Sequence, residues 1–371
     1  MESTSTNKKK VVVIGKLPPP IMGPAMATKI ILESSLKDIY DLVHFDITIN
    51  KEIATQGELS VKKVFSSIAL YVSYYRLLKM ERPDLVIMSS FSQSVIGFFK
   101  DIPYLIFPKW FGIKVVGQLR GSNFKNILAG TNSFFAWIIK NVLGKVDGVI
   151  VLGNNLRYIF KGIVDNDKLF VVPNGANYSL EASSNENTGK VNILYLANLY
   201  ESKGVDKVVD AAIELNDDRC NFTLAGGWRS DEEFKRNLLL KIEQSNANIN
   251  LQPPVSGKAK FKLFANADIF VFPPQKPEGH PWVLVEAMAY GLPIISTDQG
   301  AIVESVIEGE NGFIVDTGGH EQIVEKIRLL LDDQELMGKM GSQSRKYYLQ
   351  KFTEEKMVEN FSTVIDTVIS K

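Results

Sequence analysis

Two carboxylates lie close together in the chain, in a setting that suits phosphate and sugar binding. The segment Lys276–Gly300, KPEGHPWVLVEAMAYGLPIISTDQG, places Glu278 and Glu286 eight positions apart. Glu278 falls in a Pro/Gly-rich loop, and Glu286 falls about one turn into a helix that we expect to begin near Pro281, because proline is favoured in the first turn of a helix. One carboxylate can accept hydrogen bonds from sugar hydroxyls, and the other can hold a ribose diol through both oxygens.

The loop between these carboxylates also suits an anion. Its residues Gly279, His280, Pro281 and Trp282 stand where the helix is expected to begin. The first N–H groups of a helix have no partner within the helix, and the positive end of its dipole attracts negative charge. A sugar nucleotide would therefore use both the loop and the carboxylates. We expect His280 to shape the loop by hydrogen bonding rather than to act as a base. Two surface glutamates beside a turn are the simpler alternative, and spacing alone favours it.

Continuous apolar runs alternate with helical patterns along the chain, which predicts parallel sheets whose strands are buried on both faces. In the first half we expect strands at Val11–Ile14, Leu85–Met88, Val115–Leu119, Val149–Leu152 and Leu169–Val172, and helices at Ala25–Leu36, Val61–Lys79 and Phe134–Leu143. In the second half we expect strands at Ile193–Leu196, Phe222–Ala225, Ile249–Leu251, Ile269–Phe272 and Pro293–Ser296, with helices at Val205–Leu215, Lys258–Ala265 and Val283–Tyr290 and another from Asp231.

A polar segment from Asn177 to Gly189, NYSLEASSNENTG, interrupts this pattern and is typical of an exposed linker. We therefore predict an α/β protein with two Rossmann-like domains, residues 1–180 and 181–350, followed by an amphipathic helix over residues 351–371. Ligands of such sheets bind beyond the carboxyl ends of the strands, so we expect a ligand cleft between the domains.

Composition narrows the class of protein. The chain has 371 residues, 45% of them hydrophobic, and a single cysteine, Cys220, which we expect to be a small buried residue of a strand. No stretch has the length of a signal peptide or a transmembrane span, and an intrachain disulfide is impossible, so we expect a cytoplasmic protein. Residues 1–180 carry 22 Lys and Arg against 13 Asp and Glu. A basic first half suits an acidic substrate or an anionic membrane surface.

The segment Lys276–Gly300, together with QGAIVESV from Gln299 and ENGFIV from Glu310, resembles the C-terminal motif of the retaining glycosyltransferases of family 4, part of the glycosyl transferases group 1, which have the GT-B fold. This resemblance implies that Glu278 orients the donor sugar and that Glu286 holds the ribose. It also implies that Lys203, which precedes Gly204 in LANLYESKGVDKVVDAA, binds the donor pyrophosphate, and that the helix over residues 351–371 packs back across the domains.

The first half resembles the family more loosely. VPNGANY looks like the family's Pro-Asn-Gly turn, and GKLPPPIMGPA from Gly15 looks like the glycine-bearing loop near the donor phosphates and the acceptor, with Gly23 where a double glycine is common. Asn198 stands five positions before Lys203, where the family has a second cation, an arginine. In QLRGSN, Arg120 stands where many members have histidine, and it is our candidate replacement cation for the donor phosphate or an acidic acceptor. A structural arginine paired with a carboxylate is the alternative.

The resemblance implies a retaining transferase that moves a sugar from a nucleoside diphosphate sugar, UDP- or GDP-linked, to a hydroxyl of a saccharide or lipid-linked acceptor in surface polysaccharide or glycolipid assembly. Two alternatives stay open. One is a nucleotide-sugar epimerase of the same fold, and the other is a catalytically silent subunit, which Asn198 favours.

The sequence also predicts which other ligands and partners the protein lacks or contacts. We expect no cofactor, no nucleic-acid partner and no metal ion, since no two histidines have the spacing of metal ligands beside a carboxylate. The aromatic stretch Val95–Gly112 would suit either a buried core or peripheral contact with the inner face of the cell membrane.

Overall fold

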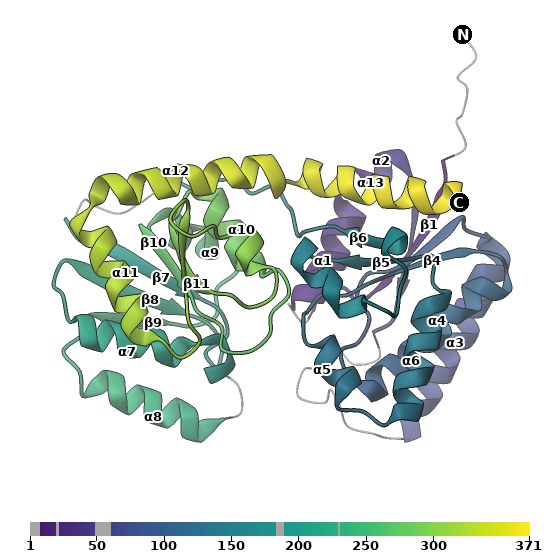
Figure 1. The fold of residues 1–371 in the computed structure, drawn as a ribbon, viewed down its shortest axis with the longest axis horizontal. Helices are drawn as coiled ribbons and strands as arrows, with labels where there is room; N and C mark the ends of the chain where they lie inside the picture. The colour runs from purple at the N-terminus through teal and green to yellow at the C-terminus, as the bar shows by residue number, and fades with distance from the viewer. Residues whose placement is uncertain (1–7, 20–21, 49–60, 183–188, 229–230) are drawn as a thin grey trace, which may run out of the picture. The chain divides into compact units, whose positions relative to one another are not determined.

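The protein forms two compact units in the computed structural model, which describes residues 8–19, 22–48, 61–182, 189–228 and 231–371. The first unit comprises Met1–Asn174 and Glu354–Lys371, and the second comprises Gly175–Thr353. Each contains a six-stranded parallel sheet with helices packed against it (Figure 1). The predicted fold class, α/β with two Rossmann-like domains, is confirmed.

The sheet of the first unit has the strand order β2-β1-β3-β4-β5-β6. Its strands are β1 (Lys10–Gly15), β2 (Asp41–Asp46), β3 (Leu85–Met88), β4 (Lys114–Gln118), β5 (Gly148–Val151) and β6 (Leu169–Val171). The expected strands of this half lie within one residue of observed ones, because their apolar runs are buried on both faces. Sequence reasoning missed β2, DLVHFD, an edge strand that mixes polar with apolar residues.

Helices cover both faces of this sheet. On one face, α1 (Gly23–Glu33), α2 (Leu36–Ile39) and α13 (Glu354–Ser370) share a core with β1 and β3. On the other lie α3 (Val61–Glu81), α4 (Val95–Trp110) and α6 (Ser133–Lys145), and α4 contacts both of its helical neighbours. The shorter helices are α5 (Phe124–Ala129), η1 (Asn154–Phe160) and η2 (Asn166–Lys168).

The last helix belongs to the first unit, although the second unit precedes it in the chain. Met357, Phe361, Val364 and Ile365 of α13, the apolar stripe of the sequence, are all buried in the core of the first unit. The hydroxyl of Tyr40 also donates a hydrogen bond to Asp366 (2.9 Å). The two ends of the chain therefore stabilise one core.

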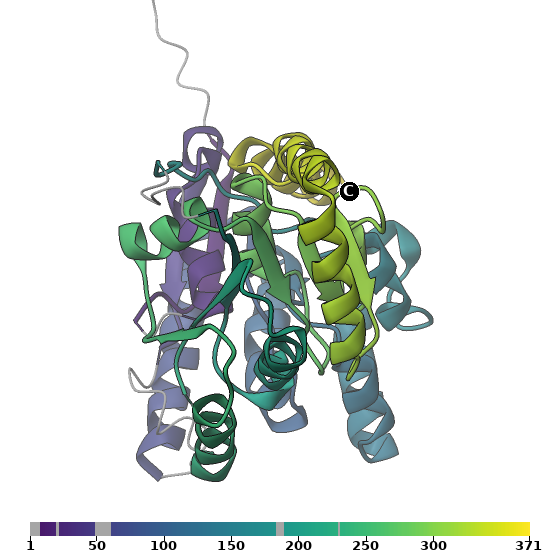
Figure 2. The ribbon, with the colours of Figure 1, turned by 90° about the vertical axis from the view of Figure 1, so that its left-hand side faces the viewer.

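The sheet of the second unit has the order β12-β11-β10-β7-β8-β9. Its strands are β7 (Val191–Leu196), β8 (Cys220–Ala225), β9 (Ile249–Gln252), β10 (Ile269–Phe272), β11 (Ile294–Thr297) and β12 (Gly312–Val315). Its helices are η3 (Glu201–Lys203), α7 (Val205–Leu215), α8 (Glu232–Glu243), α9 (Gly257–Ala265), α10 (Trp282–Ala289), η4 (Ile302–Glu304), α11 (His320–Asp332) and α12 (Gln334–Lys351), with α11 and α12 in yellow-green in Figure 2. Cys220 is 1% exposed, as expected.

The order of strands reverses at one point of each sheet. In the second unit the chain runs from β7 outward to β9 and then returns to β10 on the other side of β7. The loops that follow β7 and β10 therefore begin side by side at the carboxyl edge of this sheet, which is where ligands bind in sheets of this kind. The first unit has the same reversal between β1 and β3. The fold thus directs attention to the loops after Leu196 and Phe272.

The segment expected to be an exposed linker begins as part of the second unit. The Tyr178 ring lies 5.6 Å from the Phe261 ring, and the Glu181 N–H donates to the Tyr290 hydroxyl (3.1 Å). Aromatic packing thus holds Tyr178 on the second unit, which begins at Gly175 rather than at residue 181. Residues 183–188 of this segment lie outside the described residues. None of the described helices is long and apolar enough to cross a membrane.

Replacing Phe361 with alanine is expected to destabilise the first unit by about 3–5 kcal/mol, since this side chain is 1% exposed and its loss leaves a cavity. Urea unfolding of the full chain measures the change. Thr363→Ala, on the exposed side of the same helix, is the control and is expected to change stability by no more than about 0.5 kcal/mol. Equal effects of the two substitutions would show that α13 contributes little to the core.

Candidate functional site

Lys203 and Glu278 form an ion pair at the carboxyl edge of the sheet of the second unit. Lys203 ends the short helix η3 after β7, and Glu278 lies in the loop after β10. The Lys203 ammonium contacts the Glu278 carboxylate, and the two side chains are 26% and 16% exposed. The two strand-following loops thus bring together residues that are 75 positions apart. The pair is accessible enough for a ligand to exchange with either partner.

Close backbone contacts fix these loops. Gly204 has φ +74°, and a Cβ there would lie 2.0 Å from the carbonyl oxygen of Pro273, so only glycine allows the turn after Lys203 to rest on the loop after β10. The Gln275 N–H donates to the Ser202 carbonyl (3.0 Å), which ties the same two loops together. The position of Lys203 is therefore set by backbone packing.

Glu286 is a buried carboxylate with one unused oxygen. It lies in α10 and is 5% exposed. One oxygen accepts from the Lys260 ammonium, a residue of α9, whereas its other oxygen is buried without a hydrogen-bond partner. Burial raises the pKa of Glu286, and the Lys260 charge opposes that rise. A buried acceptor without a partner is costly, so this oxygen is suited to a donor from a ligand.

The loop before α10 is fixed by contacts of His280 and Gly279. Pro281 is the residue before the helix, which begins at Trp282, close to the expected start. His280 is 3% exposed, its Nε2 lies 2.7 Å from the Ser305 hydroxyl, and its ring packs 5.0 Å from Phe352. The Ala301 N–H donates to the Gly279 carbonyl (2.8 Å). His280 therefore shapes the loop through contacts within the second unit.

Asn198 occupies the turn after β7, ahead of Lys203. It is exposed, and its carbonyl accepts from the Tyr195 hydroxyl (3.1 Å) and the Tyr200 N–H (3.1 Å). Its backbone thus supports the turn, and its side chain contributes no charge to it. Lys203 is the cation of this turn.

Arg120 lies at the carboxyl edge of the sheet of the first unit and has neutral partners. Its guanidinium donates to the Ser89 carbonyl, the Asn174 side chain and the Gln118 side chain, each at 2.8 Å. Burial lowers the pKa of Arg120 to about 9. No carboxylate among the described residues pairs with it, so the alternative of an arginine paired with a carboxylate does not hold in this structure.

Gly23 begins α1, which follows β1 through a loop whose residues 20 and 21 lie outside the described residues. The strand end itself is crowded, because a Cβ at Gly15 would lie 2.3 Å from the Ser89 hydroxyl oxygen. The Thr28 hydroxyl of α1 lies 2.7 Å from the same Ser89 hydroxyl, so α1 passes close to the end of β3.

The predicted site residues therefore fall into two groups. The second unit brings together most of them, namely Lys203, Glu278, Gly279, His280, Pro281, Trp282, Glu286 and Asn198, and the first unit carries Arg120 and Gly23. Sequence reasoning missed Lys260, the partner of Glu286. It lies in a helix that was expected, but its sequence separation from Glu286 gives no sign that they meet.

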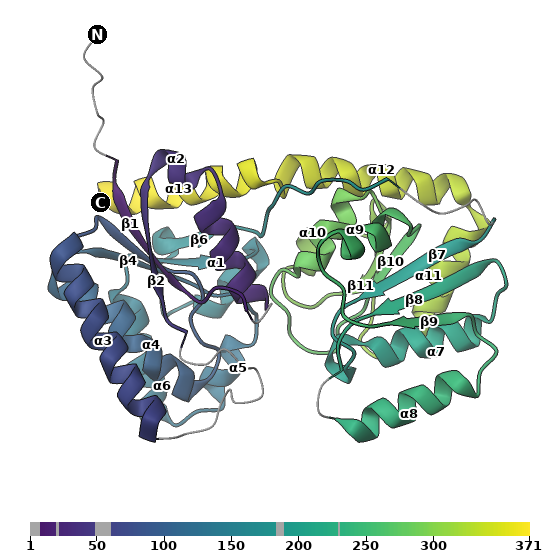
Figure 3. The ribbon, with the colours of Figure 1, turned by 180° about the vertical axis from the view of Figure 1, so that it is seen from behind.

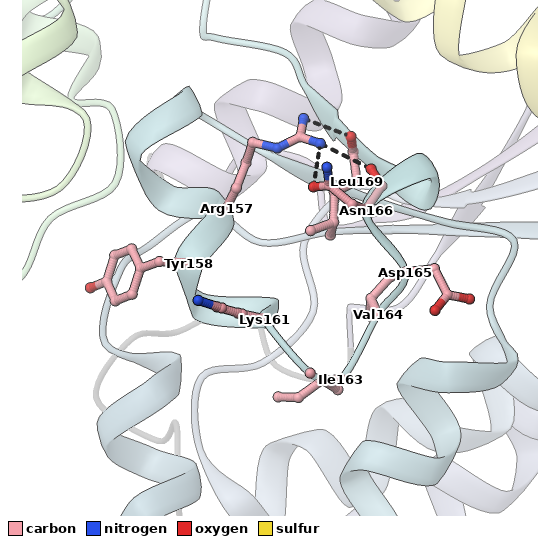
Figure 4. Close-up of a pocket in the computed structure, with 9 residues that line it drawn as sticks. Arg157, Tyr158, Lys161, Ile163, Val164, Asp165, Asn166 and Leu169 are labelled. Carbon is pink, nitrogen blue, oxygen red and sulfur yellow. Dashed lines mark hydrogen bonds between the residues drawn. The ribbon is translucent and has the colours of Figure 1, made fainter.

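A separate pocket lies in the first unit, between η1 and the start of β6 (Figure 4). Arg157 spans it and donates to the carbonyls of Leu169 and Asn166, both at 2.9 Å. Its lining includes Asp165 and Asn166, which form an Asp-x-Asp pattern with the following Asp167. Sequence reasoning missed this pattern. Lys168 pairs with the first carboxylate (3.7 Å) and Lys371 with the second (2.7 Å). The pocket contains none of the predicted site residues.

Comparison with known proteins locates the family signal in the second unit. Residues 179–347 match the family model described as "Glycosyl transferases group 1". The capsular polysaccharide biosynthesis glycosyltransferase CapM of Staphylococcus aureus is 27% identical over 66% of this chain and 62% of its own length. Spore coat protein SA of Bacillus subtilis is 29% identical over 48% and 49%. The chain thus spans about half to three-fifths of the length of these curated relatives.

Solved structures match the whole chain. The Anabaena protein HepE in complex with UDP-glucose has a TM-score of 0.74 at 14% identity and covers 98% of this chain and 100% of its own. Sucrose-phosphate synthase from Thermosynechococcus elongatus has a TM-score of 0.78 at 15% identity, with the same coverage. At such identities the likeness establishes the fold, which is GT-B. The family match and the fold together support a glycosyltransferase of the GT-B type.

Gly300→Ala is expected to destabilise the second unit more than Gly318→Ala. Both glycines have positive φ (+64° and +85°), so an alanine costs about 1–2 kcal/mol of backbone strain at either position. At Gly300 the new Cβ would also lie 2.1 Å from the Glu278 carbonyl oxygen, whereas nothing lies within 4 Å at Gly318. Thermal unfolding of the two variants measures the difference. An equal loss of thermal stability in the two variants would mean that the loop carrying Glu278 moves to accommodate the new Cβ at little cost.

Proposed function

We propose that this protein is a retaining glycosyltransferase of family 4 that moves a sugar from a nucleoside diphosphate sugar to an acceptor hydroxyl. One observation carries the proposal. The strand reversal of the second unit holds an exchangeable Lys203–Glu278 pair beside a helix start, with the half-satisfied carboxylate of Glu286 in that helix. The chain thus offers a cation and backbone donors for a diphosphate, and carboxylates for hydroxyl groups.

The nucleoside would bind through Glu286. Its unpaired oxygen accepts a ribose hydroxyl, and Lys260 keeps the carboxylate ionised by contacting the other oxygen. Because that acceptor is already buried, a ribose donor would remove a desolvation cost that the unliganded protein bears. UDP-glucose in the HepE complex supports a UDP-linked donor, and a GDP-linked donor is the other candidate.

The diphosphate would take Lys203 from Glu278. A phosphate is a stronger partner than the partly solvated carboxylate, and the N–H groups near Gly279–Trp282 add neutral donors at the helix start. Release of Lys203 leaves the Glu278 carboxylate free to accept hydrogen bonds from the donor sugar and to stabilise positive charge on its ring. One ion pair in the free protein thus becomes two ligand contacts.

In the transfer step, the bond between the anomeric carbon and the diphosphate oxygen breaks, and its electron pair leaves with the diphosphate. The acceptor oxygen bonds to the same face of that carbon, and its proton passes to the departing phosphate. No enzyme nucleophile is required. Lys203 would stabilise the charge that grows on the leaving group, which is the contribution that lowers the barrier.

Two departures from the family pattern bear on this scheme. Asn198 supplies no second cation, so the diphosphate depends more on Lys203 and the backbone. Arg120, with three neutral acceptors, would act as a cation in the first unit toward the donor phosphate or an acidic acceptor, and the loop ending at Gly23 would shape the acceptor side. The acceptor would belong to surface polysaccharide or glycolipid assembly, as the name of the S. aureus relative supports.

Lys203→Met is expected to lower kcat/KM for the donor by about 10²–10³, the usual loss when one group that stabilises transition-state charge is removed. Release of nucleoside diphosphate from a panel of UDP- and GDP-sugars measures it. Lys207→Met is the matched control, because this lysine lies one turn along and pairs with Asp206. Equal activity of both variants would contradict the role of Lys203, and sugar isomerised without acceptor would favour an epimerase.

Nucleoside diphosphate affinity is expected to fall as the pH is lowered. The bound ribose needs the ionised Glu286, whose pKa burial raises above its ordinary value of 4.5. Affinity is therefore full above that raised pKa and is lost as the pH falls through it. Lys260→Met removes the charge that opposes the rise, so the midpoint should move to higher pH. Calorimetric titration of UDP and GDP across pH measures both midpoints. Affinity of the wild type that persists below pH 4.5 would contradict the assignment.

A further inference from the structure

The outward side of α3 is apolar and basic. Phe65, Ile68, Val72 and Tyr75 recur at intervals of three and four residues and are 67%, 51%, 45% and 40% exposed. This spacing places them along one side of the helix, opposite the fully buried Tyr74 and Leu78, which face the core. From the sequence, this row of apolar residues would be predicted to face the core, but in the structure it faces solvent.

The neighbouring helices extend this surface. Trp110 of α4 is 65% exposed, and Phe134 and Trp137 of α6 are 62% and 60% exposed. The ring of Phe107 bridges two of the helices, since it lies 6.1 Å from Tyr75 of α3 and 4.8 Å from Trp110. Figures 1 and 3 both show α4 between α3 and α6. Of 17 large hydrophobic side chains exposed among the described residues, ten lie on these three helices.

This finding refines the expectation for the aromatic stretch Val95–Gly112. Most of that stretch is α4, whose Phe98 and Tyr104 are buried. The stretch thus contributes mainly core, and the exposed apolar side chains come largely from α3 and α6, which the sequence did not single out.

The charges on this layer have one sign. Exposed Arg76 and Lys79 of α3, Lys100 of α4, and Lys140 and Lys145 of α6 interleave with the apolar residues. The acidic residues of these helices are Glu81 and Asp101. Glu81 pairs with Lys10 (2.7 Å), and Asp101 is 6% exposed and accepts from the Ser92 N–H (2.6 Å). No exposed acid among the described residues of these helices balances the basic side chains.

We propose that the outer layer formed by α3, α4 and α6 rests on an anionic lipid surface. Tryptophan, phenylalanine and tyrosine side chains would enter the boundary between headgroups and acyl chains, and the lysines and Arg76 would contact lipid phosphates. Charge complementarity selects this partner, because five exposed bases without a balancing acid would repel a second copy of the same surface. The proposal needs no sugar transfer and stands independently of it.

Flotation of the full-length protein with vesicles tests the proposal. Wild type is expected to float with vesicles of phosphatidylcholine containing 30% phosphatidylglycerol, to bind phosphatidylcholine alone far more weakly, and to be released by high salt. Two double variants address separate helices, namely Val72→Ser with Arg76→Glu on α3 and Trp137→Ser with Lys140→Glu on α6. Each is expected to lower the partition coefficient at least about fivefold, the effect of about one basic residue near an anionic surface.

The matched control is Leu349→Ser with Lys346→Glu on α12 of the second unit, where both side chains are exposed and the net charge change is the same. It should bind vesicles like wild type, and circular dichroism should show that all variants are folded, since every altered side chain is exposed. The proposal is overturned if the wild type does not bind anionic vesicles, or if the control variant loses as much binding as the α3 and α6 variants. A wild-type dimer in light scattering that the α3 or α6 variant dissociates would also overturn it, by assigning the surface to a second copy.

Discussion

The reversal of strand order between β7 and β10 is the constraint on which the candidate site depends. It forces two loops that are far apart in sequence to begin side by side at the carboxyl edge of one sheet. Their contact is tight enough that Gly204 has no room for a side chain against the Pro273 carbonyl. Lys203 and Glu278 meet because backbone contacts hold their two loops together. The chemistry proposed for the protein follows from this contact.

Electrostatics then divides the work between two carboxylates of one short segment. Glu278 and its partner Lys203 are both partly exposed, so a ligand can replace either side chain in the ion pair. Glu286 is buried, contacts Lys260 through one oxygen, and keeps the other oxygen without a partner. A solvated carboxylate suits transient contacts with a sugar, whereas a buried and preoriented one suits a fixed nucleoside. In the proposed scheme the same residue type would thus serve two purposes, because the surroundings of the two carboxylates differ.

Much of the fold could be predicted from sequence because buried parallel strands are unmistakable apolar runs, as Leu85–Met88 shows. β2 was missed because an edge strand needs fewer apolar residues. In the candidate site, the spacing of Glu278 and Glu286 and the family resemblance singled out the segment Lys276–Gly300, and this assignment stays a prediction. Nothing in the sequence marked Lys260, which meets Glu286 only in the folded chain. The exposed apolar face of α3 could not be predicted, because its apolar residues have the spacing of a helix that faces the core.

Binding of nucleoside diphosphates tests the central claim most directly. Thermal unfolding of wild type and of Glu286→Ala would be followed with UDP, GDP, ADP, dTDP and CDP in turn. A ligand at 100 times its Kd stabilises a protein by about 2.7 kcal/mol, which is a readily measured shift. The account predicts that one nucleotide stabilises wild type and that Glu286→Ala loses this stabilisation. Absence of stabilisation by every nucleotide, or an equal shift in the variant, would contradict it.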